Sequence, residues 1–430
     1  MAVDASGLAA PHAGPGTGHP VRVLAAAMLP GLVAIWVFSG GFVLIEPAPY
    51  EALFLLVLGA AFLGGMWLYR GTLGLFLLLV VFLPFAVIAA FQARHFELKD
   101  TFIYLCITVY LWLTAYVTAN FVADDPGRHT ALIVRAYTAV AVLSALVGTL
   151  AYLGLMPFEE YFLRYGRAKA AFEDPNVFAP FLVLPAVFAA QALFLQRGRA
   201  AVLAALVLVI LITGVFVSFS RGAWGHLFAS GVLSFGLIFF IEARARDKVR
   251  MLLLALVGGA GLVVLIAALL SIDNVRELFL ERFTLTENYD TGTTGRFGRQ
   301  SYAFDLALSN PWGIGAKEFT ALRIVEEPHN TYVNVLLVYG WGGGLAYIAM
   351  IGMTLWRALS RLATRSPSRI ALIALVATYI PLITEAAIID TDHWRHFFLI
   401  TGLIWGVTAG YGGVAARRSS GASAQPAAFS

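Results

Sequence analysis

Long apolar segments recur along almost the whole of this chain. About twelve of them reach roughly 20 residues, the length that a helix needs to cross the hydrocarbon core of a bilayer. They run near 22–44, 50–69, 72–92, 101–122, 130–155, 176–196, 200–219, 223–241, 250–272, 331–356, 369–389 and 395–415. Lipid offers no hydrogen-bond partner to open backbone groups, so each segment is expected to be a helix. The sequence therefore predicts an all-α polytopic membrane protein.

Composition agrees with this fold class and excludes others. The chain is 60% hydrophobic and 13% charged, more apolar than a soluble protein of this length can bury. Its single cysteine, Cys106, rules out an intrachain disulfide. The net charge of +4 gives no reason to expect nucleic acid as a partner.

One polar loop stands out between the apolar segments. Residues 273–330 hold six Lys/Arg and nine Asp/Glu, or 15 of the 54 charged side chains. We expect a disordered tail at 1–20, nine transmembrane helices in 21–272, this loop domain at 273–330, three further helices in 331–415, and a disordered tail at 416–430. The first apolar run has no convincing cleavage site before it continues into the next span, so we interpret it as a retained signal anchor.

Positive charges set the expected orientation. The densest short loops, 242–250 and 357–369, fall on one side if the spans alternate, and that side should be the cytoplasm. Both tails are then cytoplasmic, and the loop 273–330 lies outside, in the periplasm of a bacterial inner membrane. Arginines that remain on the outer side need a reason, and binding a phosphate-bearing lipid headgroup is a natural one.

Three arginines in two short runs are candidates for that role. Arg221, in Ser218-Phe-Ser-Arg221-Gly, joins two spans with almost no loop and must lie at the membrane boundary. Arg296 and Arg299 begin an expected short amphipathic helix that Pro311 and the following glycines should end, with Phe297, Tyr302, Phe304, Leu306 and Leu308 as its apolar positions. Their spacing places both guanidinium groups on one face, where they can bracket a diphosphate. The alternatives are a snorkelling Arg221 and a solvated basic face.

His329 is the candidate for chemistry. It follows Pro328 and heads the apolar segment 331–356. Imidazole changes its charge near neutral pH and suits a general base, although an interfacial histidine without a catalytic role is the alternative. No metal site is persuasive, because His393 and His396 near Asp390 and Asp392 form the only cluster of ligand types. The sequence also lacks a Walker A motif, so we expect no cofactor and a donor that arrives already activated.

Four pieces of sequence together resemble the O-antigen ligase and polysaccharide-polymerase superfamily. They are Arg167 with Phe172-Glu-Asp-Pro175-Asn176, then Ser218-Phe-Ser-Arg221-Gly, then Arg296 before Pro311-Trp-Gly-Ile-Gly315, and last His329-Asn330-Thr-Tyr332 with Gly340-Trp-Gly342. The resemblance is clearest over residues 160–350. It implies a GT-C-like membrane glycosyltransferase that takes glycan from undecaprenyl diphosphate, with inversion and without a metal ion.

The resemblance also implies roles for individual residues. Arg221 and Arg296 bind the donor diphosphate, with Arg299 and Arg167 in secondary positions, and His329 acts on the acceptor hydroxyl. Asn330 and Tyr332 are secondary site residues beside it. A ligase uses the lipid A–core as acceptor, and a polymerase uses a second lipid-linked glycan. A late, dominant outer loop favours the ligase. A lipid-glycan transporter is the alternative from another class, and it should show internal repeats or paired broken helices.

Overall fold

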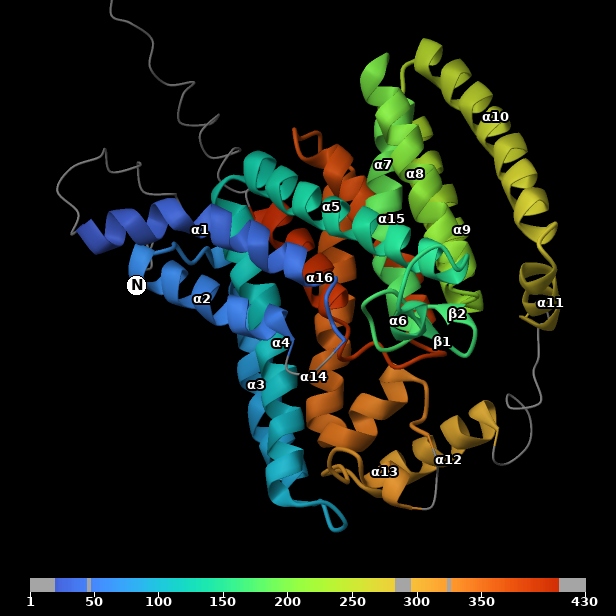
Figure 1. Ribbon diagram of the computed structural model, residues 1–430. Coiled ribbons are helices and arrows are strands. Elements are labelled where there is room, and N and C mark those ends of the chain that lie inside the picture. Colours follow the sequence, from blue (N-terminus) through green and yellow to red (C-terminus); the bar gives the residue numbers. More distant parts are fainter. Residues whose placement is uncertain (1–19, 45–47, 283–294, 323–325, 410–430) are drawn as a thin grey trace, which may run out of the picture.

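The computed structural model describes residues 20–44, 48–282, 295–322 and 326–409, and these ranges are almost wholly helical (Figure 1). The predicted tails lie outside them, except for Pro20, with which the first helix begins. The α-helices are α1 Pro20–Ser39, α2 Pro49–Gly64, α3 Leu73–Ala90, α4 Leu98–Asp124, α5 Pro126–Tyr152, α6 Pro175–Phe181, α7 Val183–Leu195, α8 Arg199–Val217, α9 Arg221–Leu237, α10 Ala245–Leu270, α11 Asp273–Arg282, α12 Arg296–Ser309, α13 Glu318–Ala321, α14 Thr331–Leu362, α15 Arg369–Glu385 and α16 Arg395–Ala409.

Short elements join some of these helices. The 3₁₀ turns η1 (Arg70–Thr72) and η2 (Glu159–Phe162) precede α3 and a small hairpin, and the π-helical turn η3 (Ile238–Glu242) extends α9. The hairpin consists of β1 (Leu163–Arg164) and β2 (Arg167–Ala168), paired antiparallel, and is the only sheet in the described residues.

The described residues support nine of the twelve predicted membrane spans. Among the described residues, nine helical stretches are long and apolar enough by length and composition. They are α1, η1 with α3, α4, α5, α6 with α7, α8, α9 with η3, α10 and α14. Each of the twelve predicted segments coincides with helix, but twelve spans are not confirmed. The three remaining predicted spans coincide with α2, α15 and α16, which have 16, 17 and 15 described residues. A helix of 16 residues is only about 24 Å long, shorter than the hydrocarbon core of about 30 Å.

Helix α16 forms the centre of the bundle. Almost every side chain from His396 to Thr408 is buried, and the helix packs on α4, α14 and α15 (Figure 1). Its glycines allow close approach to α4, since a Cβ on Gly402 or Gly406 would lie 2.5 Å from Ala115 O or 2.7 Å from Ala119 O. Small residues four apart on facing helices are how membrane helices bring their backbones together. A helix that is buried on all sides lies in the core of the bundle, and α16 has this position.

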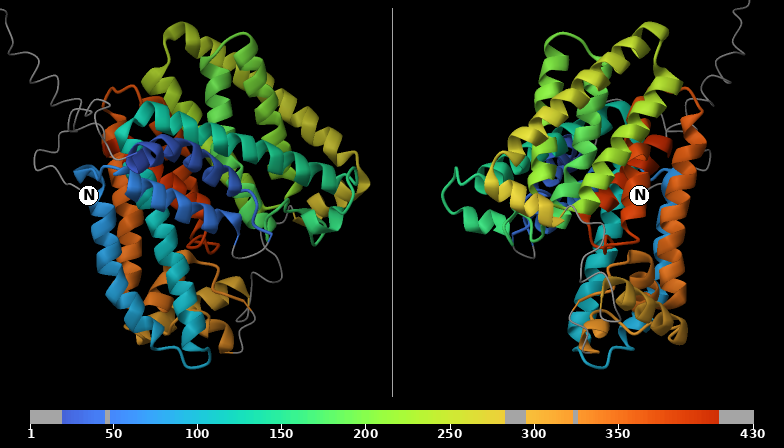
Figure 2. Two further views of the ribbon diagram at one scale, coloured as in Figure 1. Left: turned by 60° about the vertical axis from the view of Figure 1, so that its left-hand side comes forward. Right: turned by 90° about the vertical axis from the view of Figure 1, so that its right-hand side faces the viewer.

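The described residues of the polar loop 273–330 pack against one end of this bundle. Helices α12 and α13 lie beside the ends of α3 and α4 in both figures (Figures 1 and 2). Glu318 of α13 fixes that arrangement, because its Oε1 accepts from the backbone N–H groups of Arg94, His95 and Phe96 at 2.8–3.2 Å. Burial raises the pKa of Glu318, but the contact with His95 and these backbone hydrogen bonds outweigh it and hold the pKa below its usual value.

A second contact inserts the turn after α12 into α14. The helix α14 is interrupted at Gly340, whose φ of 70° and ψ of 178° are not helical. The turn fills the break, since Trp341 N donates to Pro311 O at 2.9 Å and Ile314 N donates to Leu337 O at 2.9 Å. The short helix ending before Pro311 is therefore confirmed. The face that α12 turns to α14 carries Ala303 and Ala307.

This junction leaves no room for side chains at its glycines. Gly313 has a φ of +82°, and a Cβ there would lie 2.6 Å from Gly340 N. We expect Gly313→Ala to lower the free energy of unfolding by about 1–2 kcal/mol through the left-handed backbone alone. Displacement of the backbone at Gly340 should add to this loss. Thermal unfolding of the purified protein measures this loss. Gly352→Ala is the matched control, because a Cβ on Gly352 of α14 meets nothing within 4 Å. Equal melting temperatures for the two variants would contradict the junction.

Candidate functional site

His329 lies just before α14 in a backbone conformation that the surrounding residues must hold. Its φ of 54° is in the left-handed region, which costs a non-glycine residue about 1–3 kcal/mol. Asp390 compensates, because its Oδ2 accepts from His329 N at 3.1 Å and its Oδ1 accepts from Asn330 N at 3.0 Å. Both carboxylate oxygens of one acid thus fix two successive peptide groups.

Asn330 and Thr331 complete the start of the helix. The Asn330 side chain is the N-cap of α14 and accepts from Tyr332 N and Val333 N at 3.1 and 3.2 Å. Thr331 N donates to Ala386 O at 2.8 Å, and Thr391 N donates to Thr331 Oγ1 at 2.7 Å. The start of α14 is therefore attached at several points to the connection between α15 and α16.

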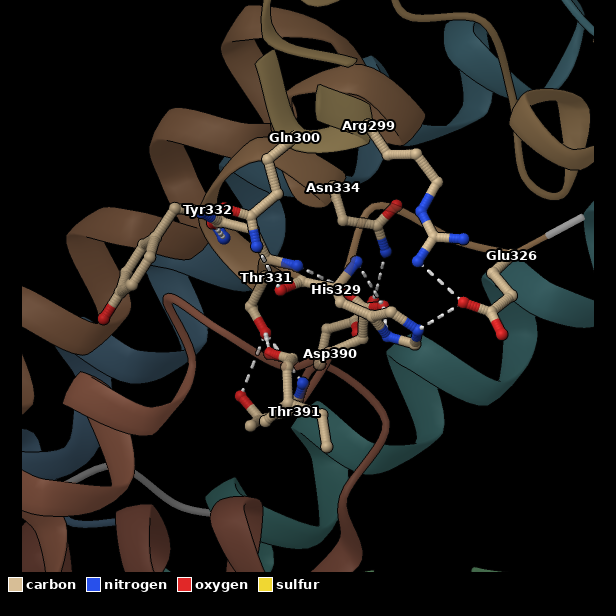
Figure 3. A network of polar contacts seen from close by, with 12 residues as sticks. Arg299, Gln300, Glu326, His329, Thr331, Tyr332, Asn334, Asp390 and Thr391 are labelled. Atoms are coloured by element: carbon tan, nitrogen blue, oxygen red, sulfur yellow. Dashed lines mark hydrogen bonds and ion pairs between the residues drawn. The ribbon is translucent and has the colours of Figure 1, made fainter. Parts of the chain in front are cut away.

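The imidazole of His329 lies between two carboxylates (Figure 3). Its Nδ1 is 3.4 Å from Asp390 Oδ2, and its Nε2 is 3.6 Å from Glu326 Oε2. The same Glu326 oxygen lies 2.7 Å from Nη2 of Arg299. Gln300, next to Arg299 on α12, donates to His329 O at 2.9 Å. About 30% of the His329 side chain is exposed, so a substrate can reach it.

Asp390 was not among the site residues proposed from the sequence, where it appears only in a weak cluster of metal-ligand types. A signal was present, however. If spans alternate, the end of segment 369–389 and the start of segment 331–356 lie on the same side of the membrane. An acid that follows one of them is then placed to meet a histidine that precedes the other.

Two further acids near His329 carry altered pKa values. Burial raises the pKa of Glu327 to about 7, helped by repulsion from Asp390 and Asp392 and opposed by His329 and Lys317. Burial likewise raises the pKa of Asp392, although Tyr104 donates a hydrogen bond to it at 3.3 Å. Glu327 can therefore gain or lose a proton near neutral pH, which is the property of a general acid or base.

Arg221 is the first residue of α9. Ser220 is the N-cap, and the preceding Phe219 has a left-handed φ of 49°. The turn is supported by Arg167, which is buried and donates from Nε to Ser218 O at 2.7 Å and from Nη2 to Asn176 Oδ1 at 2.9 Å. Two of the sequence pieces, the Arg167–Asn176 segment and the Ser218–Gly222 turn, are thus brought together. These contacts of Arg167 are structural, and its diphosphate role stays a prediction.

The end of α15 connects Arg221 with His329. Oε1 of Glu385 lies against Gly222, 2.7 Å from where a Cβ would stand. The next residue, Ala386, accepts the hydrogen bond from Thr331 N. Two consecutive residues of one chain segment therefore touch the start of α9 and the start of α14, so both lie at the same end of the bundle.

The remaining predicted residues have clear positions. Arg296 begins α12 and Arg299 follows one turn later, with Arg299 held by Glu326. Tyr332, in the first turn of α14, directs its hydroxyl to Ile383 O of α15. Within the residues that the structure describes, no group of three or more His, Cys, Asp or Glu side chains is arranged to hold a metal ion.

The raised pKa of Glu327 predicts a pH effect on stability. Between about 4.5 and 7 the folded protein keeps this proton while the unfolded chain releases it, so stability falls as pH rises through that window. Glu327→Gln should therefore melt higher than wild type above pH 7, and the gain should vanish below pH 4.5. Thermal unfolding from pH 4.5 to 8 measures it, with Glu160→Gln at an exposed position as control. A gain that is the same at every pH would show that ionisation of Glu327 is not the cause.

Comparison with known families agrees with the resemblance found in the sequence. Residues 206–348 match a family model described as O-antigen ligase. The matched segment includes Arg221, Arg296, Arg299 and His329, whereas Arg167 and Asp390 lie outside it. No curated protein matches the chain. Members of that family are membrane glycosyltransferases with ligase or polymerase activity, and the match does not distinguish the two. Residues 206–348 are thus similar to the O-antigen ligase family.

Proposed function

We propose that this chain is an O-antigen ligase that transfers glycan from undecaprenyl diphosphate to the lipid A–core of lipopolysaccharide. The observation that carries the proposal is the position of His329, which lies inside the segment that matches the O-antigen ligase model. Asp390 holds this histidine just before the start of α14. The reaction takes place at the periplasmic face of the inner membrane. It needs no metal ion and inverts the anomeric centre.

His329 is the general base in this mechanism. With its Nδ1–H directed at Asp390, the lone pair of Nε2 is available for the acceptor hydroxyl. The hydroxyl oxygen attacks the anomeric carbon, its proton passes to Nε2, and the bond from that carbon to the diphosphate oxygen breaks. The imidazolium that forms lies between Asp390 and Glu326, and both carboxylates stabilise its positive charge.

The arginines act on the leaving group. Undecaprenyl diphosphate leaves with the bonding electron pair, so the charge on its bridging oxygen grows, and Arg221 and Arg296 stabilise it. Arg299 has a different part in this arrangement, because its guanidinium already holds Glu326. We assign it to positioning Glu326 beside His329, with a direct phosphate contact only if Glu326 is displaced. Arg167 supports the turn that carries Arg221.

A two-substrate assay separates this function from its alternatives. Purified protein in liposomes receives lipid-linked O-antigen, either alone or with rough lipopolysaccharide, and product size is measured on a gel. A ligase forms product only when the lipopolysaccharide is present. Growth of glycan from the donor alone would identify a polymerase, and movement of donor between leaflets without covalent transfer would identify a transporter.

Substitutions should separate the donor site from the base. We expect His329→Ala to bind the lipid-linked donor normally while transfer falls about 10²–10⁴-fold, the usual contribution of a general base. Arg221→Ala should lose donor binding as well. Arg221→Lys should rescue only partly, because an ammonium group cannot reproduce a bidentate guanidinium. Donor binding and single-turnover transfer are measured for each variant, with and without a chelator. Near-normal transfer by His329→Ala would reject it as the base.

A further inference from the structure

A buried polar pair joins α9 to the end of α15. His226 Nδ1 lies 2.9 Å from Glu385 Oε2, and His226 Nε2 lies 3.1 Å from Thr378 O. The side chains are 0% and 5% exposed. A carbonyl oxygen only accepts, so Nε2 carries a hydrogen, and the contact on the other side of the ring holds one more hydrogen, on Nδ1 or on the carboxyl group.

The pair is placed at the first turns of α9. Gly222 and His226 are four residues apart and lie on the same face of that helix. Glu385 spans this interval, with Oε1 against Gly222 and Oε2 on His226. Any side chain at position 222 would displace the carboxylate. The glycine that follows Arg221 therefore makes space for Glu385.

The same short segment of chain also holds His329. Glu385 ends α15, Ala386 accepts from Thr331 N, and Asp390 accepts from His329 N. Displacement of the Glu385 carboxylate relative to α9 is thus displacement of the segment to which the base is attached. Helix α9 begins with Arg221, so the pair sets the spacing between that arginine and the base.

The two helices have a second polar clamp at their other end. Arg369, which begins α15, is paired with Glu242 at the end of η3, the continuation of α9. The Arg369–Glu242 pair already joins these helices, and apolar residues pack helices without the desolvation cost of buried polar groups. The buried hydrogen bond between His226 and Glu385 therefore indicates a role other than holding the two helices together.

We propose that His226 and Glu385 are positioning residues that hold Arg221 in register with His329, and so set the affinity for the polyprenyl diphosphate donor. This inference rests on the proposed function in one respect, the assignment of Arg221 to the diphosphate. The pair itself contacts neither substrate. Its hydrogen bonds fix the direction in which the start of α9 leaves the Glu385–Asp390 segment.

Apolar replacement tests the pair, because it keeps the packing of α9 on α15 but removes the hydrogen bonds that orient the start of α9. The single variants Glu385→Leu and His226→Leu leave one buried polar group without its partner, so both should melt lower and bind donor more weakly. The double variant replaces both groups and should recover most of the melting temperature. Its dissociation constant for undecaprenyl diphosphate should stay about tenfold above wild type, since no directional contact remains. Glu385→Gln keeps a hydrogen bond to His226 and should bind within about threefold of wild type.

Binding is measured on the full chain in detergent with undecaprenyl diphosphate as probe, through quenching of tryptophan fluorescence. The matched control is Arg369→Leu with Glu242→Leu, which removes the clamp at the far end of the same helices and should leave the dissociation constant unchanged. Wild-type affinity in the His226→Leu, Glu385→Leu double variant would overturn the inference, as would equal weakening in the control or Glu385→Gln binding as weakly as the double variant. If the predicted binding pattern holds but wild-type protein transfers no glycan, the proposed function fails and the positioning role stands.

Discussion

The contact between Asp390 and two successive peptide N–H groups is the constraint on which the candidate site depends. It holds His329 in a left-handed conformation, which costs a non-glycine residue about 1–3 kcal/mol. The same carboxylate lies 3.4 Å from Nδ1 of the imidazole, which leaves Nε2 on the side of Glu326. Since Asn330 then caps α14, one acid determines the backbone, the side-chain orientation and the start of the helix together.

Two backbone junctions bring the rest of the site to that acid. The turn after α12 enters the break at Gly340, which fixes the helix that carries Arg296 and Arg299. The residues from Glu385 to Asp390 touch both α9 and the start of α14. Arginines from distant parts of the sequence are thereby held at one end of the bundle. These junctions, more than any single helix, determine the relative positions of the site residues.

The sequence was sufficient for features that depend on local pattern. Apolar length located every helix that the twelve segments predicted, and Pro311 with its glycines located the end of α12. The resemblance found the matched family through short motifs that include His329. Hydrophobicity did not separate spanning helices from core helices, because α16 is buried on all sides and is as apolar as a lipid-facing helix. Length and composition in the described residues support nine of the twelve predicted spans.

Contacts between distant segments were beyond the reach of local pattern. Asp390 and Glu385 lie in or beside an apolar stretch, and only folding brings them to His329 and His226. The break of α14 was also missed, since a glycine within an apolar run does not show which turn will enter there. The sequence identified the candidate arginines, but the pairing of Arg299 with Glu326 became apparent only in the folded structure.

Replacement of Asp390 by asparagine tests whether this carboxylate holds the base in its working position. The substitution keeps the shape but exchanges one acceptor oxygen for an N–H₂ group, which cannot accept from a backbone N–H. Single-turnover glycan transfer and undecaprenyl diphosphate binding are compared with those of Asp305→Asn, an exposed acid on α12. We expect Asp390→Asn to bind donor like wild type and to lose at least about 10²-fold in transfer, whereas Asp305→Asn should keep both. Transfer by Asp390→Asn within a few-fold of wild type would contradict it.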